Sequence, residues 1–205
     1  MTASINPIDV PAFDAVSIKI LEAALAEFTE FGLRRVSVDD IAGRAGVHRT
    51  TIYRYFKTKQ EIIQAAAAKW IQDLFVAVAI EVGAQPTIED QLVEGWATCF
   101  GRILDSPLVQ RILSTDTDAG VRAVTVDGGP ALTMVSGMFA VWLKQACNTD
   151  IGGDFDPEGL AEIVARLGLS MVLTPQSHFH LDSADGRREF ARRYLVPFLP
   201  ASRQS

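Results

Sequence analysis

Cysteine and histidine are scarce in this sequence, which has 2 cysteines and 3 histidines among 205 residues. Cys99 and Cys147 lie within apolar runs of helical character, which favours buried core thiols over a disulfide pair. A redox switch is the less favoured interpretation. His178 and His180 share a segment without a cysteine or carboxylate at metal-ligand spacing. We therefore expect no metal site and no cofactor.

The usual signatures of enzymes and of membrane proteins are also missing. The chain has no phosphate-binding glycine loop and no Ser/His/Asp or Cys/His grouping that would supply a nucleophile with its base. No run of 18 apolar residues predicts a membrane span, and the first residues lack the basic start and apolar segment of a secretory signal. These absences predict a cytoplasmic protein that is not an enzyme. An enzyme acting on a small apolar molecule stays an open alternative.

What the sequence does contain is helical periodicity with clear stops. Ile18, Leu21, Leu25 and Phe28 form one apolar stripe along a helix expected over residues 14–31. No stretch alternates in the manner of a strand, so the predicted fold class is all-α. Further helices are expected over residues 37–45, 49–56, 58–82, 87–104, 129–147, 156–175 and 183–196, with a short one from residue 106 and loops over 148–155 and 176–182.

Residues 39–56 carry the pattern that indicates a function. A first helix with an apolar face ends at Gly46, where a left-handed residue suits a tight turn. A second helix follows, with Ile52 and Phe56 at the i, i+4 spacing of an inward face. Its outward face presents the donors, hydroxyls and ring that phosphates and base edges accept: Arg49, Thr50, Thr51, Tyr53 and Arg54. This pattern predicts a helix-turn-helix whose second helix enters the major groove of DNA.

Positive charge is concentrated around the same stretch. Residues 33–60 hold seven Arg or Lys against two Asp, a net charge of +5, whereas the whole chain has −6 and the remainder therefore −11. An acidic protein with one basic segment has a localised site for a polyanion. A merely solvated cluster is the alternative, and the neighbouring turn glycine and hydroxyl-rich helix favour DNA. The overall acidity argues against an architectural protein that binds DNA without sequence preference.

Helix starts account for the acidic residues of this segment. Ser37 is expected to be an N-cap with Asp40 three residues on, a variant of the capping box. Asp39 and Asp40 also suit the first turn of a helix, so neither needs a role in DNA binding. His48 takes the N-cap position of the next helix, where Ser, Thr, Asp or Asn is usual, and its ring is a candidate for a phosphate contact.

The next helix start has its own signal. Thr58 and Glu61 form a T-x-x-E capping box. Lys59 in the same turn, beside the free N–H groups of the helix start, would make a phosphate clamp. The helix that begins here and continues to about residue 82 is long enough to belong to two parts of the protein.

Several of these segments resemble the DNA-binding signature of the TetR family of bacterial transcription regulators: Ser37 to Ala42, Ala45-Gly46-Val47, Arg49 to Phe56, and Lys59. The resemblance covers about residues 15–65. It implies a three-helix DNA-binding head with the helix-turn-helix (14–60) and a C-terminal helical domain for ligand binding and dimerisation (61–205). It also implies a homodimer whose interface is built from the helices at about 130–147 and 157–174. Residues 1–13 are expected to be a flexible N-terminal arm, because they contain two prolines and no periodic pattern.

Matching positions carry the family's DNA contacts onto this chain. The resemblance implies that the groove is faced by Arg49, Thr50 and Tyr53, with Arg54 on the same outward face. It implies that the DNA backbone is held by Thr51, Tyr55 and Lys59, with Ser37 or Val38 near it. His48 departs from the commoner serine of the family.

The expected function is a ligand-responsive transcription regulator, a repressor that binds a palindromic double-stranded DNA operator as a dimer and is released by a small molecule. An activator of the same fold is the alternative. The effector is expected to be hydrophobic or aromatic, because large apolar side chains occur in the helices that would surround a pocket: Trp70, Phe75, Trp96, Phe100, Met134, Met138, Phe139 and Trp142. The plainer interpretation of each of these side chains is that it fills the core.

Overall fold

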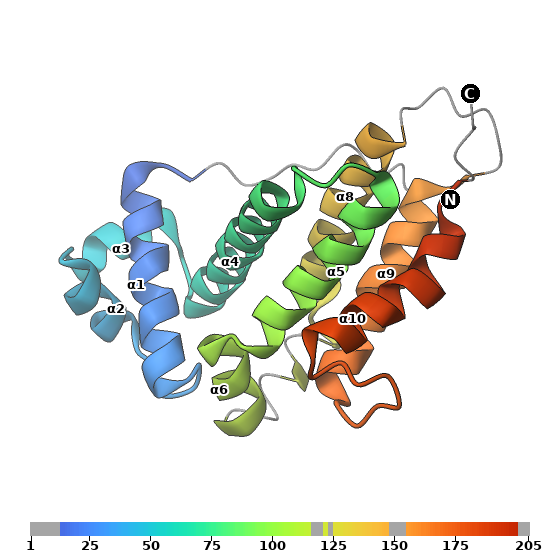
Figure 1. Cartoon of the computed structure of the whole chain (residues 1–205). Helices are drawn as coiled ribbons and strands as arrows, with labels where there is room; N and C mark the ends of the chain where they lie inside the picture. Colours follow the sequence, from blue (N-terminus) through green and yellow to red (C-terminus); the bar gives the residue numbers. More distant parts are fainter. Residues whose placement is uncertain (1–12, 116–120, 123–124, 148–154, 201–205) are drawn as a thin grey trace. The chain divides into compact units, whose positions relative to one another are not determined.

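The computed structural model describes residues 13–115, 121–122, 125–147 and 155–200 (Figure 1). These residues form helices and connecting segments without a strand, which confirms the all-α fold class. The expected arm, apart from Phe13, and most of the loop expected over 148–155 lie outside the described residues. The chain divides into two compact units. We call them the head unit, with the described residues of Val10–Asp73 and Asp105–Ala131, and the C-terminal unit, with Leu74–Leu104 and the described residues from Leu132 onward.

Three N-terminal helices gather in the head unit: α1 (Ala15–Phe31), α2 (Val38–Ala45) and α3 (Arg49–Tyr55) (Figure 1). Of the apolar stripe predicted for the first helix, Leu21 and Phe28 are buried in the common core, and Leu25 packs against it. Ile18 is only half-buried, and Ile20 is fully buried instead. Asp14 caps the helix by accepting a hydrogen bond from the Ser17 N–H at 2.7 Å. The fully buried side chains of this core come from several helices: Ile20, Leu21, Ile41, Ile52 and Ile62.

One fully buried side chain is the main anchor of α3 in the core, and the half-buried Tyr55 packs against the same core. Ile52 is 0% exposed, and it is the one buried residue of this helix. Phe56, which ends the helix, is buried beside it. An isolated helix of seven residues is not stable in water, because nucleation costs more than so few hydrogen bonds return. The position of α3 therefore depends on Ile52 and on the turn that precedes it.

A helix from later in the chain completes the head unit. In α6 (Pro107–Thr115), Leu108 and Ile112 pack against the same core. The Arg111 Nε–H donates to the Thr29 carbonyl near the end of α1, at 3.2 Å. The sequence predicted a short helix here without indicating that it packs on α1.

The long helix α4 (Lys59–Val82) runs through the boundary between the units, which falls after Asp73. Its first turns contribute Ile62 and Ala66 to the head core. By length and composition alone, α4 is apolar enough to cross a membrane, a test that core helices of other proteins also pass. The ion pair of Lys69 with Asp73, at 2.7 Å, interrupts its apolar surface.

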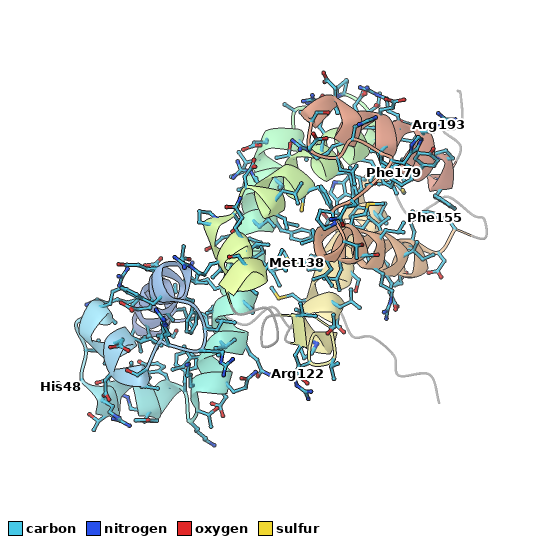
Figure 2. The ribbon with its side chains drawn as sticks, turned by 90° about the horizontal axis from the view of Figure 1, so that it is seen from below. His48, Arg122, Met138, Phe155, Phe179 and Arg193 are labelled. Carbon is cyan, nitrogen blue, oxygen red and sulfur yellow. The ribbon has the colours of Figure 1, made fainter. Side chains whose placement is uncertain are left out.

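The C-terminal unit contains α5 (Ile88–Leu104), most of α8 (Gly129–Ala146), α9 (Pro157–Leu173) and α10 (Ala184–Phe190). Its core is mainly aliphatic and contains the rings of Trp96, Phe100 and Phe190, with Phe155 and Phe179 packed against it (Figure 2). Burial of these aliphatic and aromatic side chains holds the unit together.

Two arginines on the basic side of α10 fasten it to α5. The Arg187 Nε–H donates to the Ala97 carbonyl at 3.0 Å, and Arg188 forms an ion pair with Glu94 at 2.9 Å. A Cβ at Gly101 would lie 2.9 Å from the Arg187 guanidinium, so a larger residue there would require the end of the Arg187 side chain to move. These two arginines are thus used within the C-terminal unit, whereas Arg192 and Arg193 are exposed.

The last helix is less regular than its periodicity predicts. Instead of one helix over residues 183–196, α10 ends at Phe190, and a π-helical turn (Ala191–Leu195) and a 3₁₀ turn (Val196–Phe198) follow. Pro197 provides the physical reason. Its ring would clash with the carbonyl four residues earlier in an α-helix, and it has no N–H to donate.

The buried anchor of α3 gives a stability prediction. Ile52→Ala should lower the free energy of unfolding by about 2–5 kcal/mol, through lost burial and the cavity that remains. Urea denaturation followed by circular dichroism measures the change. Gln64→Ala, an exposed site on α4, is the control, with an expected change below about 0.5 kcal/mol. Equal midpoints for the two variants would contradict the anchoring role.

Candidate nucleic-acid interface

The start of α2 is fixed by the capping box that the sequence predicts. The Ser37 Oγ accepts from the Asp40 N–H at 3.2 Å, and an Asp40 carboxylate oxygen accepts from the Ser37 N–H at 2.8 Å. Hydrogen bonds from the Ser37 hydroxyl and N–H lower the pKa of Asp40 below its usual value. At the other end, Gly46 has φ 60 in the left-handed region, which confirms the predicted turn.

A buried carboxylate locks α2 against α1. Glu27 is 8% exposed, and its Oε1 lies 2.6 Å from the Arg44 Nε. The second edge of the Arg44 guanidinium reaches Glu30 at 2.5 Å. Arg44 was counted in the basic segment, but its charge is neutralised within the fold. It contributes to the position of α2, and it is not a free cation for DNA.

The exposed face of α3 carries the polar residues predicted for the DNA-facing side. Arg49, Thr50, Tyr53 and Arg54 are exposed. His48 lies at the N-cap of α3 without a side-chain capping hydrogen bond, on the outer edge of the head unit (Figure 2). This face is polar and has no part in the core, so it is available for an external partner.

Among the remaining predicted contacts, Tyr55 has a hydrogen-bond partner within the head unit. The Tyr55 hydroxyl donates to an Asp14 carboxylate oxygen at 3.1 Å, which ties α3 to the start of α1. Thr51 and Tyr55 are half-buried, as is Val38 at the start of α2. Their roles at the DNA backbone stay predictions.

Arg49 takes part in a cluster that the sequence analysis missed. Its Nη1 lies 2.7 Å from the Asp39 Oδ2, and its Nη2 donates to the Tyr53 hydroxyl at 3.1 Å. The guanidinium carbon lies 5.3 Å from the centre of the Tyr53 ring. The hydrogen bond to Tyr53, followed by the charge of Asp39, raises the pKa of Arg49. The explanation of Asp39 as only a helix-starting residue was therefore incomplete.

The start of α4 shows half of the predicted second capping box. The Thr58 Oγ1 accepts from the Glu61 N–H at 3.1 Å, as predicted. The Glu61 carboxylate instead accepts from the N–H of Lys57, one residue earlier than the box requires, at 2.8 Å. Lys59 Nζ lies 3.4 Å from the carbonyl of Arg34 in the loop between α1 and α2, and its role as a phosphate clamp stays a prediction.

The predicted pocket residues fall into separate groups. Trp96 stacks on Phe100 at 5.2 Å in the C-terminal core, and Phe139 stacks on Trp142 at 5.5 Å along α8. Met134 is buried, whereas Phe75 and Met138 are half-buried. That these side chains surround one ligand stays a prediction.

Trp70 lies elsewhere, at a hollow of about 560 Å³ in the head unit. The hollow lies between α1, α4 and the start of α6, and the other residues that line it are Leu25, Ala26, Thr29, Glu30, Ser106, Pro107 and Leu108. The sequence did not indicate this hollow, because its walls come from three distant segments.

The histidine pair and the cysteines show no sign of a reactive site. His178 and His180 are both exposed. Among the described residues, no three His, Cys, Asp or Glu side chains gather as a metal ion would require. Cys99 and Cys147 are free thiols. Cys99 is half-buried overall, yet desolvation raises the pKa of its thiol to about 11, with Arg102 acting in the opposite direction.

A capped α2, a left-handed glycine turn and an α3 with an exposed polar face define a helix-turn-helix DNA-binding protein. Residues 20–66, which include all of α2 and α3, match the family model described as "Bacterial regulatory proteins, tetR family". Residues 20–66 therefore carry the DNA-binding domain of the TetR family of bacterial transcription regulators.

Known relatives agree with this assignment. The HTH-type transcriptional regulator AlkX of Mycobacterium tuberculosis is 25% identical over 214 residues, which cover 97% of this chain and 98% of the relative. The HTH-type transcriptional repressor SCO4008 of Streptomyces coelicolor is 32% identical over 92 residues, 45% of this chain and 42% of the relative. Both are named as regulators of transcription and not as enzymes.

One solved structure covers nearly the whole fold. It is that of the TetR family repressor AlkX from Dietzia sp. strain DQ12-45-1b, which is implicated in biodegradation of n-alkanes. The TM-score is 0.69 at 20% identity, over 90% of this chain and 97% of the Dietzia chain. At this identity the likeness shows the shared fold.

The raised pKa of Cys99 predicts low thiol reactivity. At about pH 8 the thiol lies far below its pKa, so little thiolate exists to attack a reagent. Ellman's reagent should label Cys99 much more slowly in the folded protein than in urea, and the rate should rise as the pH approaches about 11. A Cys147→Ser variant isolates the Cys99 signal. Labelling at the unfolded rate near neutral pH would contradict the burial of this thiol and revive a redox role.

Proposed function

We propose that this protein is a ligand-responsive repressor, which binds a palindromic operator as a homodimer and leaves it when a small apolar effector binds. The observation that carries the proposal is the exposed face of α3. Only Ile52 of this helix is buried, and Arg49, Thr50, Tyr53 and Arg54 are left at the surface. Such side chains bind base edges and phosphates in a major groove.

The helix ends beside α3 support phosphate contacts on both of its sides. Ser37 lies at the start of α2, and Lys59 lies in the first turn of α4. Two helix starts and a lysine offer N–H donors and positive charge to the DNA backbone. We assign Ser37, Val38, Thr51, Tyr55 and Lys59 to this backbone-holding role.

Exposed apolar side chains on the last two long helices support a homodimer. Ile163 and Leu167 are 54% and 39% exposed, one turn apart on α9, and Val141 of α8 is 37% exposed. Burying such side chains against a second copy is favourable, at about 25 cal/mol for each Å² of apolar surface. A symmetric dimer would present two recognition helices, as a palindromic operator requires.

The aromatic side chains within the core of the C-terminal unit support an apolar effector. Trp96 lies between Phe100 and Phe190, and its Nε1–H is buried without an acceptor among the described residues. An unpaired buried donor costs about 1–3 kcal/mol, so a ligand with an acceptor group would gain by binding beside it. The similarity to the Dietzia structure supports only the fold, so the proposed class of effector is inferred from these side chains.

The contact of α6 with α1 supports a route for release. Arg111 holds the end of α1, and Leu108 and Ile112 enter the head core. A ligand that shifts α4 or α6 would alter the position of the head. A coupling of about 3 kcal/mol would weaken operator binding roughly 150-fold. Transcription of a reporter with and without the protein distinguishes repression from activation by the same head.

The ring of Tyr53 gives a direct test of the DNA-binding face. Tyr53→Ala should abolish sequence-specific binding in a gel shift and leave the dimer intact by light scattering, because the side chain is 41% exposed. Tyr53→Phe keeps the ring and removes the hydroxyl that accepts from Arg49, so its loss should be smaller. Unchanged operator affinity in Tyr53→Ala would overturn the assignment of this face.

The dimer face gives an independent test. Ile163→Asp combined with Leu167→Asp should yield a monomer in light scattering and weaken operator binding, because two charges would have to be desolvated at the interface. Ile80→Asp, at an apolar position of α4 that is 76% exposed, is the matched control and should stay dimeric. A dimer that survives the double substitution would place the interface elsewhere.

A further inference from the structure

Asp39 is a negative charge at the DNA-facing surface that the proposed function does not use. Its neighbour Asp40 serves the capping box, whereas the Asp39 carboxylate lies 2.7 Å from Arg49. The side chains of Asp39 and Arg49 are 61% and 55% exposed. A carboxylate beside a groove-facing cation weakens attraction to DNA, because it cancels part of the charge that phosphates would neutralise.

We propose that Asp39 is a specificity-determining residue, which holds the Arg49 guanidinium so that backbone phosphates compete poorly for it and a suitable base edge competes well. The inference rests on the proposed function, in which Arg49 faces the groove. It assigns to Asp39 a role in discrimination between sequences and not in binding itself.

The geometry of the Asp39–Arg49–Tyr53 cluster explains why operator DNA and non-specific DNA would bind with different affinities. Arginine has five N–H donors, and Arg49 uses Nη1 toward Asp39 and Nη2 toward Tyr53. The donors that remain, on a guanidinium already oriented over the Tyr53 ring, suit the paired O6 and N7 acceptors of a guanine. Arg49 can therefore remain paired with Asp39 while it binds the guanine, and the charge of the Asp39 carboxylate stays neutralised.

Non-specific DNA offers Arg49 phosphates only. If a phosphate replaces Asp39 as the partner of Arg49, the Asp39 carboxylate is left unpaired beside a polyanion. If the phosphate leaves the Arg49–Asp39 pair intact, it meets a pair of zero net charge and is not attracted by it. Either way, Asp39 lowers the affinity of the head for DNA without the right base edge. The effect is one of charge and should depend on salt.

The test compares operator DNA, found by in vitro selection, with a scrambled duplex of equal length. Asp39→Asn in the full chain should bind the scrambled duplex roughly 3–10-fold more tightly, and its log affinity should fall more steeply with log salt by about 0.9. Operator affinity should change by less than about 3-fold, so the ratio of operator affinity to scrambled-duplex affinity should fall. Asp73→Asn, which removes the same charge from the Lys69 pair on α4, should leave both affinities unchanged.

A double-mutant cycle shows whether Asp39 acts through Arg49. In an Arg49→Ala background, Asp39→Asn should no longer change discrimination, because the oriented group is gone. If Asp39→Asn lowered this affinity ratio equally with and without Arg49, Asp39 would act by repelling DNA directly, and the proposal would be overturned. Circular dichroism verifies folding, and Asp39→Gln is a second neutral variant if Asp39→Asn is unstable. A wild-type protein that does not prefer its selected operator would refute the proposed function itself, whereas a wild type that discriminates with an inert Asp39 would refute only this inference.

Discussion

The short helix α3 cannot hold its own shape, and the DNA-facing surface depends on how the rest of the head holds it. Seven residues are too few for a stable isolated helix. Ile52 fixes α3 to the core, and the Tyr55 hydroxyl ties it to Asp14 at the start of α1. Because these contacts use the inner side of the helix, the outer side is free to present polar groups in a defined orientation. Recognition needs that orientation, since base edges accept hydrogen bonds in fixed directions.

The same head shows why a basic segment is not the same as a basic surface. Arg44 is neutralised by Glu27 and Glu30, where it joins α2 to α1. Arg49 is shared between Asp39 and Tyr53. The net charge of residues 33–60 therefore overstates the charge that DNA would meet. Arg44 uses its charge to stabilise the fold, and the fold orients the charge of Arg49. This arrangement favours selective binding over general attraction to DNA.

Local features of the fold were predictable from sequence, and long-range ones were not. Ser37 with Asp40 and the glycine at position 46 act within one helix turn, so their effects can be inferred from spacing alone. Arg49 and Asp39 lie on different helices, and their pairing depends on how α2 and α3 cross. The packing of Arg111 on the end of α1 joins residues 82 positions apart. Helical periodicity also predicted one helix up to residue 196, whereas α10 ends at Phe190 and a π-helical turn and a 3₁₀ turn that contains Pro197 follow.

The central claim is that this protein reads a two-fold symmetric operator with one α3 from each subunit. In vitro selection of random duplexes by the full chain, with the stoichiometry of the selected complex measured by light scattering, tests it most directly. The account predicts an enriched inverted repeat whose half-sites lie about 10 base pairs apart, or a multiple of that distance, bound by an even number of subunits. Enrichment of no sequence, or of a single site bound by one subunit, would contradict it.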